Sequence, residues 1–195
     1  MIDPAQDRLI EEIAKCSSDP LRYAKLVFPW RVPGSPLENY DGPDVWQLEL
    51  MAHIKAEIAA KRFPIQCAVS AGHGVGKSAL ASMLTKWSLS TMTDARVSIT
   101  ANTGDQLATK TSPEIAHWHR MALDSHWFAK EATSLRSCDP RHEQTWRADL
   151  VTWSEHRPEA FAGLHNRGRR ITLLMDEGSI IPKTIWDVAE GALTD

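Results

Sequence analysis

The residues with the clearest chemical potential form the segment Ala71-Gly72-His73-Gly74-Val75-Gly76-Lys77-Ser78. It follows the pattern G-x-x-x-x-G-K-[ST] of a phosphate-binding loop, with alanine at the first position. Glycines let successive backbone N–H groups converge on phosphate oxygens, and a helix that begins at the loop adds the partial positive charge of its N-terminus. The residues expected to bind a nucleotide here are Gly72, His73, Gly74, Val75, Gly76, Lys77, Ser78 and Ala79.

Two side chains of the loop are expected to have specific roles. Lys77 would reach the β- and γ-phosphates and assist catalysis, and the Ser78 hydroxyl would be a ligand of Mg²⁺. A glycine-rich turn that carries Gly-Lys-Ser by chance is the alternative. The apolar run before the loop and the helical pattern after it provide the strand–loop–helix context that favours phosphate binding.

A pair of acidic residues forms the second candidate group. Asp176 and Glu177 follow the apolar run 171–175, and parallel strands open their sites at their carboxyl ends. Asp176 is then expected to hold Mg²⁺, directly or through water, and Glu177 to orient and deprotonate the attacking water. Two solvated turn acids are the alternative for this pair alone. Together with the loop, the pair predicts hydrolysis of a nucleoside triphosphate.

The composition of the 195-residue chain narrows the classes of protein. It is 43% hydrophobic and 24% charged, which excludes a disordered tail, a fibrous repeat and a supercharged protein. The formal net charge is −3, so nucleic acid would have to bind at a local basic patch. No apolar run approaches the ~18 residues of a membrane helix. The three cysteines are far apart, indicate a reducing compartment and are expected to be buried: Cys16, Cys67 and Cys138.

Hydrophobic spacing predicts the elements that must position these residues. The first 43 residues are expected to form an extension with two short helices in 4–28 and a loop over 29–43. The predicted helices of the second part run from the cap Asp44 to Phe63-Pro64, over 79–90, over most of 104–130 with a restart at Ser112-Pro113, and near 182–192. The predicted strands lie at 65–70, 96–101, near 149–153 and at 171–175, with a polar stretch at 133–145. This alternation predicts an α/β parallel sheet flanked by helices over 44–195.

Several further segments bring the chain close to a known family. The sequence resembles the large, motor subunit of double-stranded DNA phage terminases, the ATPases that package DNA into empty capsids. The resemblance covers roughly residues 20–195 and is most specific in 158–194. Its matching segments are Trp46-Gln47, Ala71–Ser78, Ser98–Ala101 with Gln106, Glu159–His165, Asp176–Ser179 and Ile185–Gly191.

The resemblance implies a P-loop NTPase fold of the additional-strand, RecA-like type, with ATP and Mg²⁺ as cofactors. It implies a motor that works as a homo-oligomeric ring in the cytoplasm of the bacterial host, with double-stranded DNA, a small terminase subunit and a portal protein as partners. Gln47 would contact adenine through its amide. The alternative for Gln47 is a capping box, since it lies three residues after Asp44.

The chain departs from the family in three places. His73 stands where many relatives carry Arg or Lys, so the charge near the phosphates would titrate near neutrality. Ala162 stands where an arginine finger is expected, and the candidates for that role are Arg157, Arg167, Arg169 and Arg170; a solvated face or a DNA-contacting patch is the alternative. The coupling-motif strand and the nuclease domain are missing after Asp195, so a fragment with weak or absent ATP turnover is expected.

Two other functions and a zinc site are alternatives to this interpretation. A helicase-type ATPase shares the same core, and a truncated remnant would bind nucleotide or partner proteins without turnover. A zinc site in 117–142 is disfavoured, because the spacing of its ligand-type residues matches no usual pattern: His117, His119, His126, Cys138 and His142. The tryptophans of the same region are expected in the core rather than stacked on bases: Trp118, Trp127 and Trp146.

Overall fold

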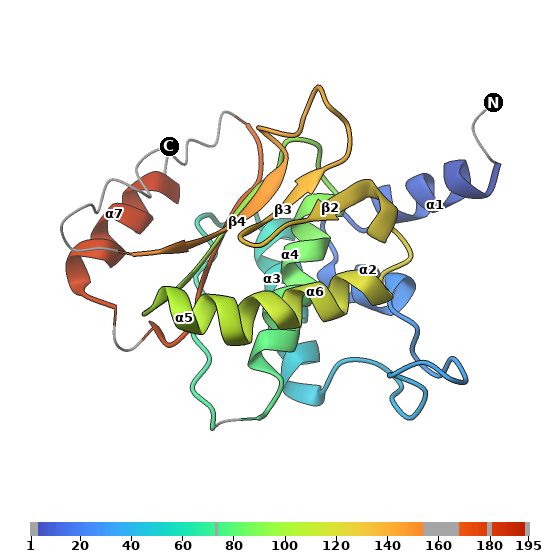
Figure 1. Ribbon diagram of the computed structural model, residues 1–195, viewed down its shortest axis with the longest axis horizontal. Helices are drawn as coiled ribbons and strands as arrows, with labels where there is room; N and C mark the ends of the chain where they lie inside the picture. Colours follow the sequence, from blue (N-terminus) through green and yellow to red (C-terminus); the bar gives the residue numbers. More distant parts are fainter. Residues whose placement is uncertain (1–3, 73, 154–167, 179–180, 194–195) are drawn as a thin grey trace.

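The fold is built on a five-stranded mixed sheet flanked by helices (Figure 1). The computed structural model describes residues 4–72, 74–153, 168–178 and 181–193. The strand order is β2-β3-β4-β1-β5, with the strands β1 (Arg96–Ala101), β2 (Phe128–Lys130), β3 (Ser134–Ser137), β4 (Arg147–Thr152) and β5 (Ile171–Met175). The predicted α/β class is therefore confirmed, together with the strands at 96–101, near 149–153 and at 171–175.

The prediction of an all-parallel sheet is wrong. β1 pairs in parallel with β4 and β5, whereas β3 pairs antiparallel with both β2 and β4. The physical reason is the length of the connections. Only three residues separate β2 from β3, and a connection this short can join antiparallel strands but cannot make a parallel crossover.

The helices also follow the prediction over most of the chain. The α-helices are α1 (Pro4–Ala14), α2 (Pro20–Val27), α3 (Val45–Ala59), α4 (Lys77–Ser90), α5 (Gly104–Gln106), α6 (Ser112–Met121) and α7 (Lys183–Leu193). A π-helical turn, η1 (Leu107–Thr111), and a 3₁₀ turn, η2 (Ser125–Trp127), complete the set. Asp19 caps α2 as expected, because its carboxylate accepts the N–H of Arg22 at 2.9 Å.

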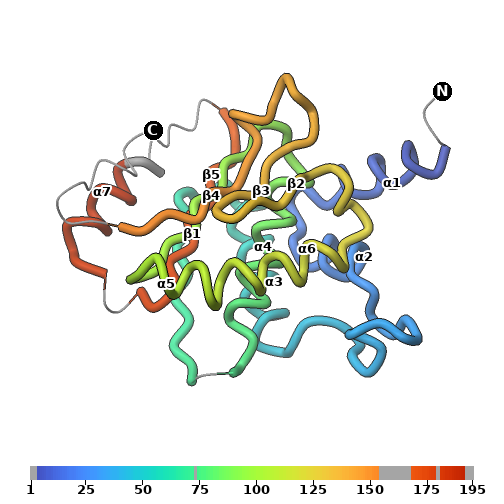
Figure 2. The backbone as a smooth tube through the Cα atoms, in the orientation of Figure 1, coloured from blue at the N-terminus to red at the C-terminus, as the bar shows by residue number. Residues whose placement is uncertain are grey.

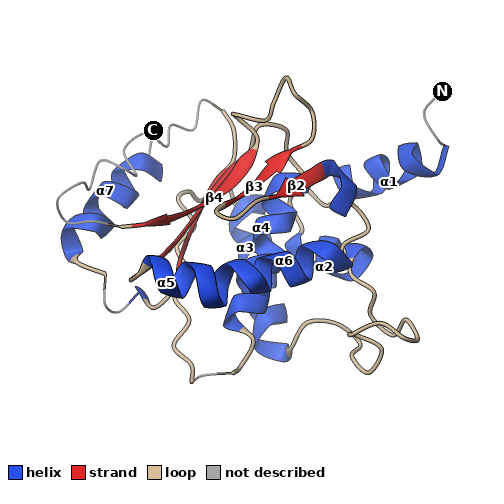
Figure 3. Cartoon of the chain, viewed as in Figure 1, coloured by secondary structure: helices blue, strands red, loops and turns tan. Residues whose placement is uncertain are grey.

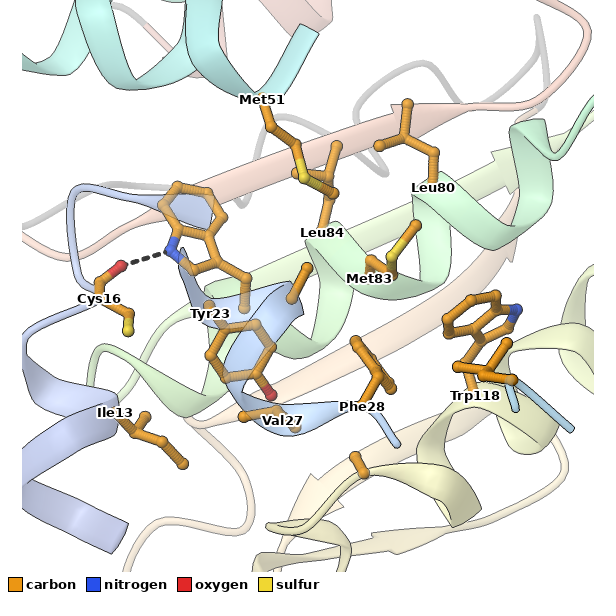
Figure 4. Packing of buried hydrophobic residues seen from close by; sticks show 14 residues of the cluster. Ile13, Cys16, Tyr23, Val27, Phe28, Met51, Leu80, Met83, Leu84 and Trp118 are labelled. Carbon is orange, nitrogen blue, oxygen red and sulfur yellow. Dashed lines mark hydrogen bonds between the residues drawn. The ribbon is translucent and has the colours of Figure 1, made fainter. Parts of the chain in front are cut away.

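The helices cover the two faces of the sheet unequally (Figure 3). One face packs on α4 and α6, and α1, α2 and α3 contribute to the same core beyond α4. Tyr23, Val27 and Met51 from these N-terminal helices meet Met83 and Leu84 of α4 (Figure 4). The opposite face is covered by Ile181 and by Ile185 of α7, against side chains of β4 and β5.

The side chains of β5 divide between these two layers. Leu174 packs toward the core of α4, while Leu173 and Met175 pack toward α7. This alternation follows from the two-residue period of a strand, and it predicts that Asp176 continues on the side of Leu174. The acidic residue therefore lies on the sheet face that α4 covers.

The predicted strand at 65–70 is wrong. The segment forms no described strand, and Gln66–Ser70 are exposed rather than buried. It lies along α3, where Trp46, Leu50 and His53 line a groove with it, and Gln66 Nε2 donates to Glu190 Oε1 of α7 at 3.3 Å. The reason is the lack of a neighbour, since a strand exists only when another strand accepts and donates its backbone hydrogen bonds, and none of the described strands pairs with this segment.

The region 104–137 differs from the prediction in two ways. Ser112-Pro113 does not restart the helix from a fresh cap; the helix continues through η1, and Ser112 N–H donates to Leu107 O. Pro113 lacks an N–H and its ring crowds the carbonyl of the preceding turn, so a wider π-helical turn accommodates it. The hairpin β2–β3 lies where helix and polar loop were expected, because its strands are short and partly polar.

The tryptophans and the cysteines were predicted to lie in the core. The tryptophan prediction is confirmed: Trp118 is buried, Trp127 and Trp146 are partly buried against the core, and Trp146 Nε1 donates to Leu89 O at 2.8 Å. Among the cysteines, only Cys16 is buried. Cys67 and Cys138 are exposed, which corrects the prediction, because Cys67 lies in the unpaired segment and Cys138 follows the end of β3.

A buried ion pair joins α4 to the turn that follows α6. Lys86 Nζ lies 2.9 Å from Asp124 Oδ1, and the two side chains are 1% and 0% exposed. The Tyr23 hydroxyl donates to Asp124 Oδ2 at 2.8 Å, so α2 is held by the same carboxylate. His119 lies beside this pair, and burial, followed by the positive charge of Lys86, lowers the pKa of His119 from 6.5 to about 4. The imidazole is therefore neutral in the folded protein at neutral pH.

This shift predicts a pH dependence of stability. An unfolded chain protonates His119 near pH 6.5, whereas the folded chain resists protonation down to about pH 4. The stabilising contribution is present above pH 6.5 and is lost as the pH falls toward 4, by roughly 3 kcal/mol in total. Urea unfolding of wild type and of His119→Gln at a series of pH values in this window should show a steeper loss in wild type. Equal slopes for the two proteins would contradict the assignment.

Candidate functional site

The glycine-rich loop leads directly into α4. Gly74 and Gly76 have φ values of 75° and 84°, in the left-handed region that glycine adopts without steric cost. Lys77 is the first residue of α4, and Leu80 N–H donates to Gly76 O at 3.0 Å. The free N–H groups of the first turn of α4 therefore adjoin the loop, as an anion-binding helix N-terminus requires. His73 lies outside the described residues.

The side chain of Lys77 folds back over the loop. Its ammonium group donates to Ala71 O at 2.7 Å and to Gly72 O at 2.6 Å. These carbonyls are neutral acceptors, and a phosphate oxygen in the loop would offer a charged acceptor and a stronger hydrogen bond. Ser78 and Ala79 are half-buried in the first turn of α4. The loop and the lysine thus offer the N–H donors and the positive charge that a phosphate group would need.

Gln47 of α3 contacts the loop from outside. Its Oε1 accepts the N–H of Asp44 at 3.0 Å, completing a capping box at the start of α3. Its Nε2 donates to Gly76 O at 2.9 Å, and its side chain is buried, with 4% of the residue exposed. The capping alternative is therefore confirmed. The second contact, which joins α3 to the loop, was not foreseen from the sequence.

The acidic pair follows β5 directly. Asp176 N–H donates to Thr100 O at 2.8 Å, extending the ladder between β5 and β1 by one residue. Asp176 Oδ2 accepts the hydroxyl of Thr111 at 3.3 Å. Glu177 is exposed and has a φ of 55°, which is uncommon for a residue other than glycine and turns the chain out of the sheet. The carboxylate of Asp176 is thus oriented by the protein, and that of Glu177 faces solvent.

The loop and the acidic pair lie at the same end of the sheet. The five residues 91–95 connect the end of α4 to the start of β1, so the beginning of α4 comes to the carboxyl ends of the parallel strands. Figure 2 shows the loop and the carboxyl ends of β1 and β5 in the lower half of the view. Among the described residues, no hydrogen bond or ion pair joins Lys77 or Ser78 to Asp176 or Glu177. The loop and the acidic pair therefore lie at the same end and on the same face of the sheet, without a direct contact between these side chains.

Thr111 is a site residue that sequence reasoning missed. It is 3% exposed and belongs to the π-helical turn η1, which presents its hydroxyl to Asp176. Single π-helical turns inside α-helices occur frequently at functional sites. The Ser112-Pro113 pair was the available signal, since it marked an irregularity of the helix beside Thr111.

The arginine candidates separate into two groups. Arg157 and Arg167 lie outside the described residues, as does Ala162. Arg170 donates to Thr91 Oγ1 and Ser17 O and stacks on Trp87 at 4.0 Å, and burial lowers its pKa to about 10. Its guanidinium is therefore committed within its own chain and is unsuited to reach a neighbouring subunit. Arg169 is exposed, with a guanidinium nitrogen 3.9 Å from Asp94 Oδ2.

The histidine-rich stretch has ordinary structural roles where it is described. His119 is buried beside Lys86, and His142 Nδ1 lies 2.7 Å from Asp94 Oδ1. Within 4–72, 74–153, 168–178 and 181–193, no three His, Cys, Asp or Glu side chains cluster in a way that could hold a metal ion. In the same ranges, no helix has both the length and the apolar character needed to cross a membrane.

Comparison with known proteins adds no relative. No protein-family model, no curated protein and no solved structure matches the chain. The assignment of the site therefore depends on the geometry of the loop, Gln47, Asp176 and Thr111.

A pair of glycine substitutions tests the contact between Gln47 and the loop. An alanine Cβ at Gly76 would lie 2.9 Å from Gln47 Nε2, whereas one at Gly74 would meet no described atom within 4 Å. Both positions have positive φ, so both variants carry the backbone cost of about 1–2 kcal/mol. Gly76→Ala should lower the free energy of unfolding by more than Gly74→Ala, measured by urea unfolding. An equal loss in the two variants would show that Gln47 does not pack on Gly76 in solution.

Proposed function

We propose that this chain is the ATP-hydrolysing motor part of a phage terminase large subunit, which drives double-stranded DNA into a procapsid. The observation that carries the proposal is the placement of a glycine loop, Lys77 and Ser78 at the start of α4, at the end and on the face of the sheet where Asp176 lies. Additional support is the resemblance in the segments around Gln47, Asp176 and Ile185. The fold is then that of an additional-strand, RecA-like P-loop NTPase.

In this proposal the residues of the chain divide the chemistry between them. The loop N–H groups and the Lys77 ammonium bind the phosphates, with Lys77 exchanging its carbonyl partners for phosphate oxygens. Ser78 and Asp176 would hold Mg²⁺, which neutralises charge on the phosphates when it is bound. Glu177 is exposed and accepts a proton from the attacking water. His73 would lie near the phosphates and Gln47 near the loop.

The described strands leave one edge of the site open. β5 pairs with β1 on one side, and no described strand pairs with its other edge. The segment 65–70, which leads into the loop, is likewise unpaired. We propose that a further strand between these two segments completes the working ATPase and brings Glu177 and Lys77 to one nucleotide. The open edge also favours a second candidate, a nucleotide-binding module without turnover.

The partners follow from the proposed class. Double-stranded DNA, a small terminase subunit and a portal protein would bind the assembled homo-oligomeric ring in the host cytoplasm. Exposed Arg169 could act across such a ring, together with Arg157 or Arg167, whereas the contacts of Arg170 assign it to the core. A helicase-type ATPase is the rival function. Unwinding of a forked duplex would favour the helicase, and translocation without strand separation would favour the packaging motor.

The proposal predicts separate effects on binding and turnover. Calorimetry with Mg²⁺ and ATP should show binding by the 195-residue chain, and Lys77→Ala should weaken it at least about tenfold, because a charge-assisted hydrogen bond is lost. Glu177→Gln should bind ATP as wild type does. Turnover by the 195-residue chain should be weak, and Glu177→Gln should abolish it.

Lys183→Ala is a matched control for the lysine, since Lys183 is exposed on α7 and pairs with Asp187. No ATP binding by wild type would contradict the proposed function. Binding without turnover, even with a portal protein and a small subunit present, would favour the second candidate.

Thr111 provides a further prediction for the proposed Mg²⁺ site. Thr111→Val keeps the shape of the side chain and removes the hydrogen bond to Asp176, so half-maximal binding of ATP should need roughly tenfold more Mg²⁺. Thr109→Val is the matched control, because Thr109 lies in the same π-helical turn and its hydroxyl donates to Asp105 O. An identical Mg²⁺ dependence in the two variants would remove Thr111 from the site.

A further inference from the structure

We propose that Gln47 is a positioning residue for the phosphate loop, which acts on the Lys77 backbone amide through the carbonyl of Gly76. The inference rests on the proposed function for its effect on ligands. The contact itself lies in the structure: Gln47 Nε2 donates to Gly76 O at 2.9 Å across 29 residues of sequence.

The carbonyl of Gly76 is held by two donors. Leu80 N–H approaches it at 3.0 Å as the first hydrogen bond of α4, and Gln47 Nε2 approaches it at 2.9 Å. A carbonyl oxygen has two lone pairs, so both bonds can form together. Leu80 belongs to α4 itself, whereas Gln47 belongs to α3. The Gln47 hydrogen bond therefore connects the Gly76 carbonyl to the capped start of α3.

The orientation of this carbonyl determines the direction of a phosphate-binding N–H. The C=O of Gly76 and the N–H of Lys77 belong to one planar trans peptide unit, so they point in opposite directions. Holding the carbonyl toward Gln47 directs the Lys77 N–H away from α3. Gly76 has a φ of 84° and no side chain to restrict rotation of this unit, so the contact with Gln47 adds a restraint to that of the Leu80 N–H.

The burial of Gln47 favours this role over direct reading of a base. Its amide oxygen is bonded to Asp44 N–H, its amide nitrogen to Gly76 O, and only 4% of the residue is exposed. A base reader has to present a donor and an acceptor to a ligand from solvent. Each amide atom of Gln47 is already bonded inside the protein, and the buried side chain presents little surface to a ligand, so we expect its influence on a nucleotide to pass through the loop and to be the same for every base.

Two variants distinguish the loop contact from the helix cap. Gln47→Met removes both hydrogen bonds of the amide without adding charge. Asp44→Ala removes the carboxylate from the capping box and keeps the backbone N–H that Gln47 accepts, as well as the contact with Gly76. Both variants are expected to lower the melting temperature. Only Gln47→Met removes one of the two restraints on the peptide unit between Gly76 and Lys77.

The first measurement is calorimetric binding of ATP, GTP and inorganic tripolyphosphate in the presence of Mg²⁺. Gln47→Met should weaken all three by the same factor, about tenfold, as expected for one net hydrogen bond. Asp44→Ala should leave the three affinities at their wild-type values. Weakening of ATP alone would identify Gln47 as a base reader and overturn the proposal, and equal weakening by the two variants would assign the effect to the cap.

The second measurement needs no ligand and separates this proposal from the proposed function. Amide hydrogen exchange over residues 74–80 should be faster in Gln47→Met than in Asp44→Ala. If wild type binds none of the three compounds, the proposed function fails, and faster exchange in Gln47→Met still supports the loop contact. Equal exchange in the two variants overturns it.

Discussion

The packing of α4 between the sheet and the N-terminal helices is the constraint on which the candidate site depends. Every residue from Ser82 to Ser90 is buried, so this helix is surrounded on all sides. Two of its polar side chains are satisfied locally, since Ser82 and Thr85 donate to the carbonyls of Ser78 and Ala81, four residues earlier. The ion pair of Lys86 with Asp124 adds a fixed contact to the turn after α6. A helix held in this way presents its first turn, and the loop before it, at one place on the sheet.

The site itself is assembled from elements that the sequence separates widely. Gln47 reaches the loop from α3, Asp176 follows β5, and Thr111 comes from a π-helical turn between β1 and β2. Each is oriented by a contact with backbone or with a buried neighbour, which limits the number of positions that its polar atoms can take. The conformation of the loop therefore depends on a contact from α3, and the orientation of the Asp176 carboxylate depends on a contact from η1.

The sequence identified the elements whose patterns are local. The cap at Asp19, the helix after Asp44 and the strand at 96–101 were predicted because capping residues and side-chain periodicity act within a few residues. The strand at 65–70 could not be judged in this way, since pairing depends on a neighbour from a distant part of the chain. The contacts of Gln47 with Gly76 and of Thr111 with Asp176 were out of reach for the same reason. Composition and spacing carry no information about which distant polar groups meet.

The difference between binding and turnover follows from where the groups are anchored. The groups proposed to bind phosphate lie in the segment 71–79, and its part from Gly76 onward is held by α4 and by Gln47. Glu177 lies on another element, after a strand with one free edge, and the chain before the loop has no strand partner among the described residues. In the proposed function, affinity for phosphate therefore depends on contacts that are already formed. The proposed catalysis would need Glu177 and Lys77 on one nucleotide. Their separation would depend on what occupies the edge of β5, so a strand at that edge would control the rate without touching the ligand.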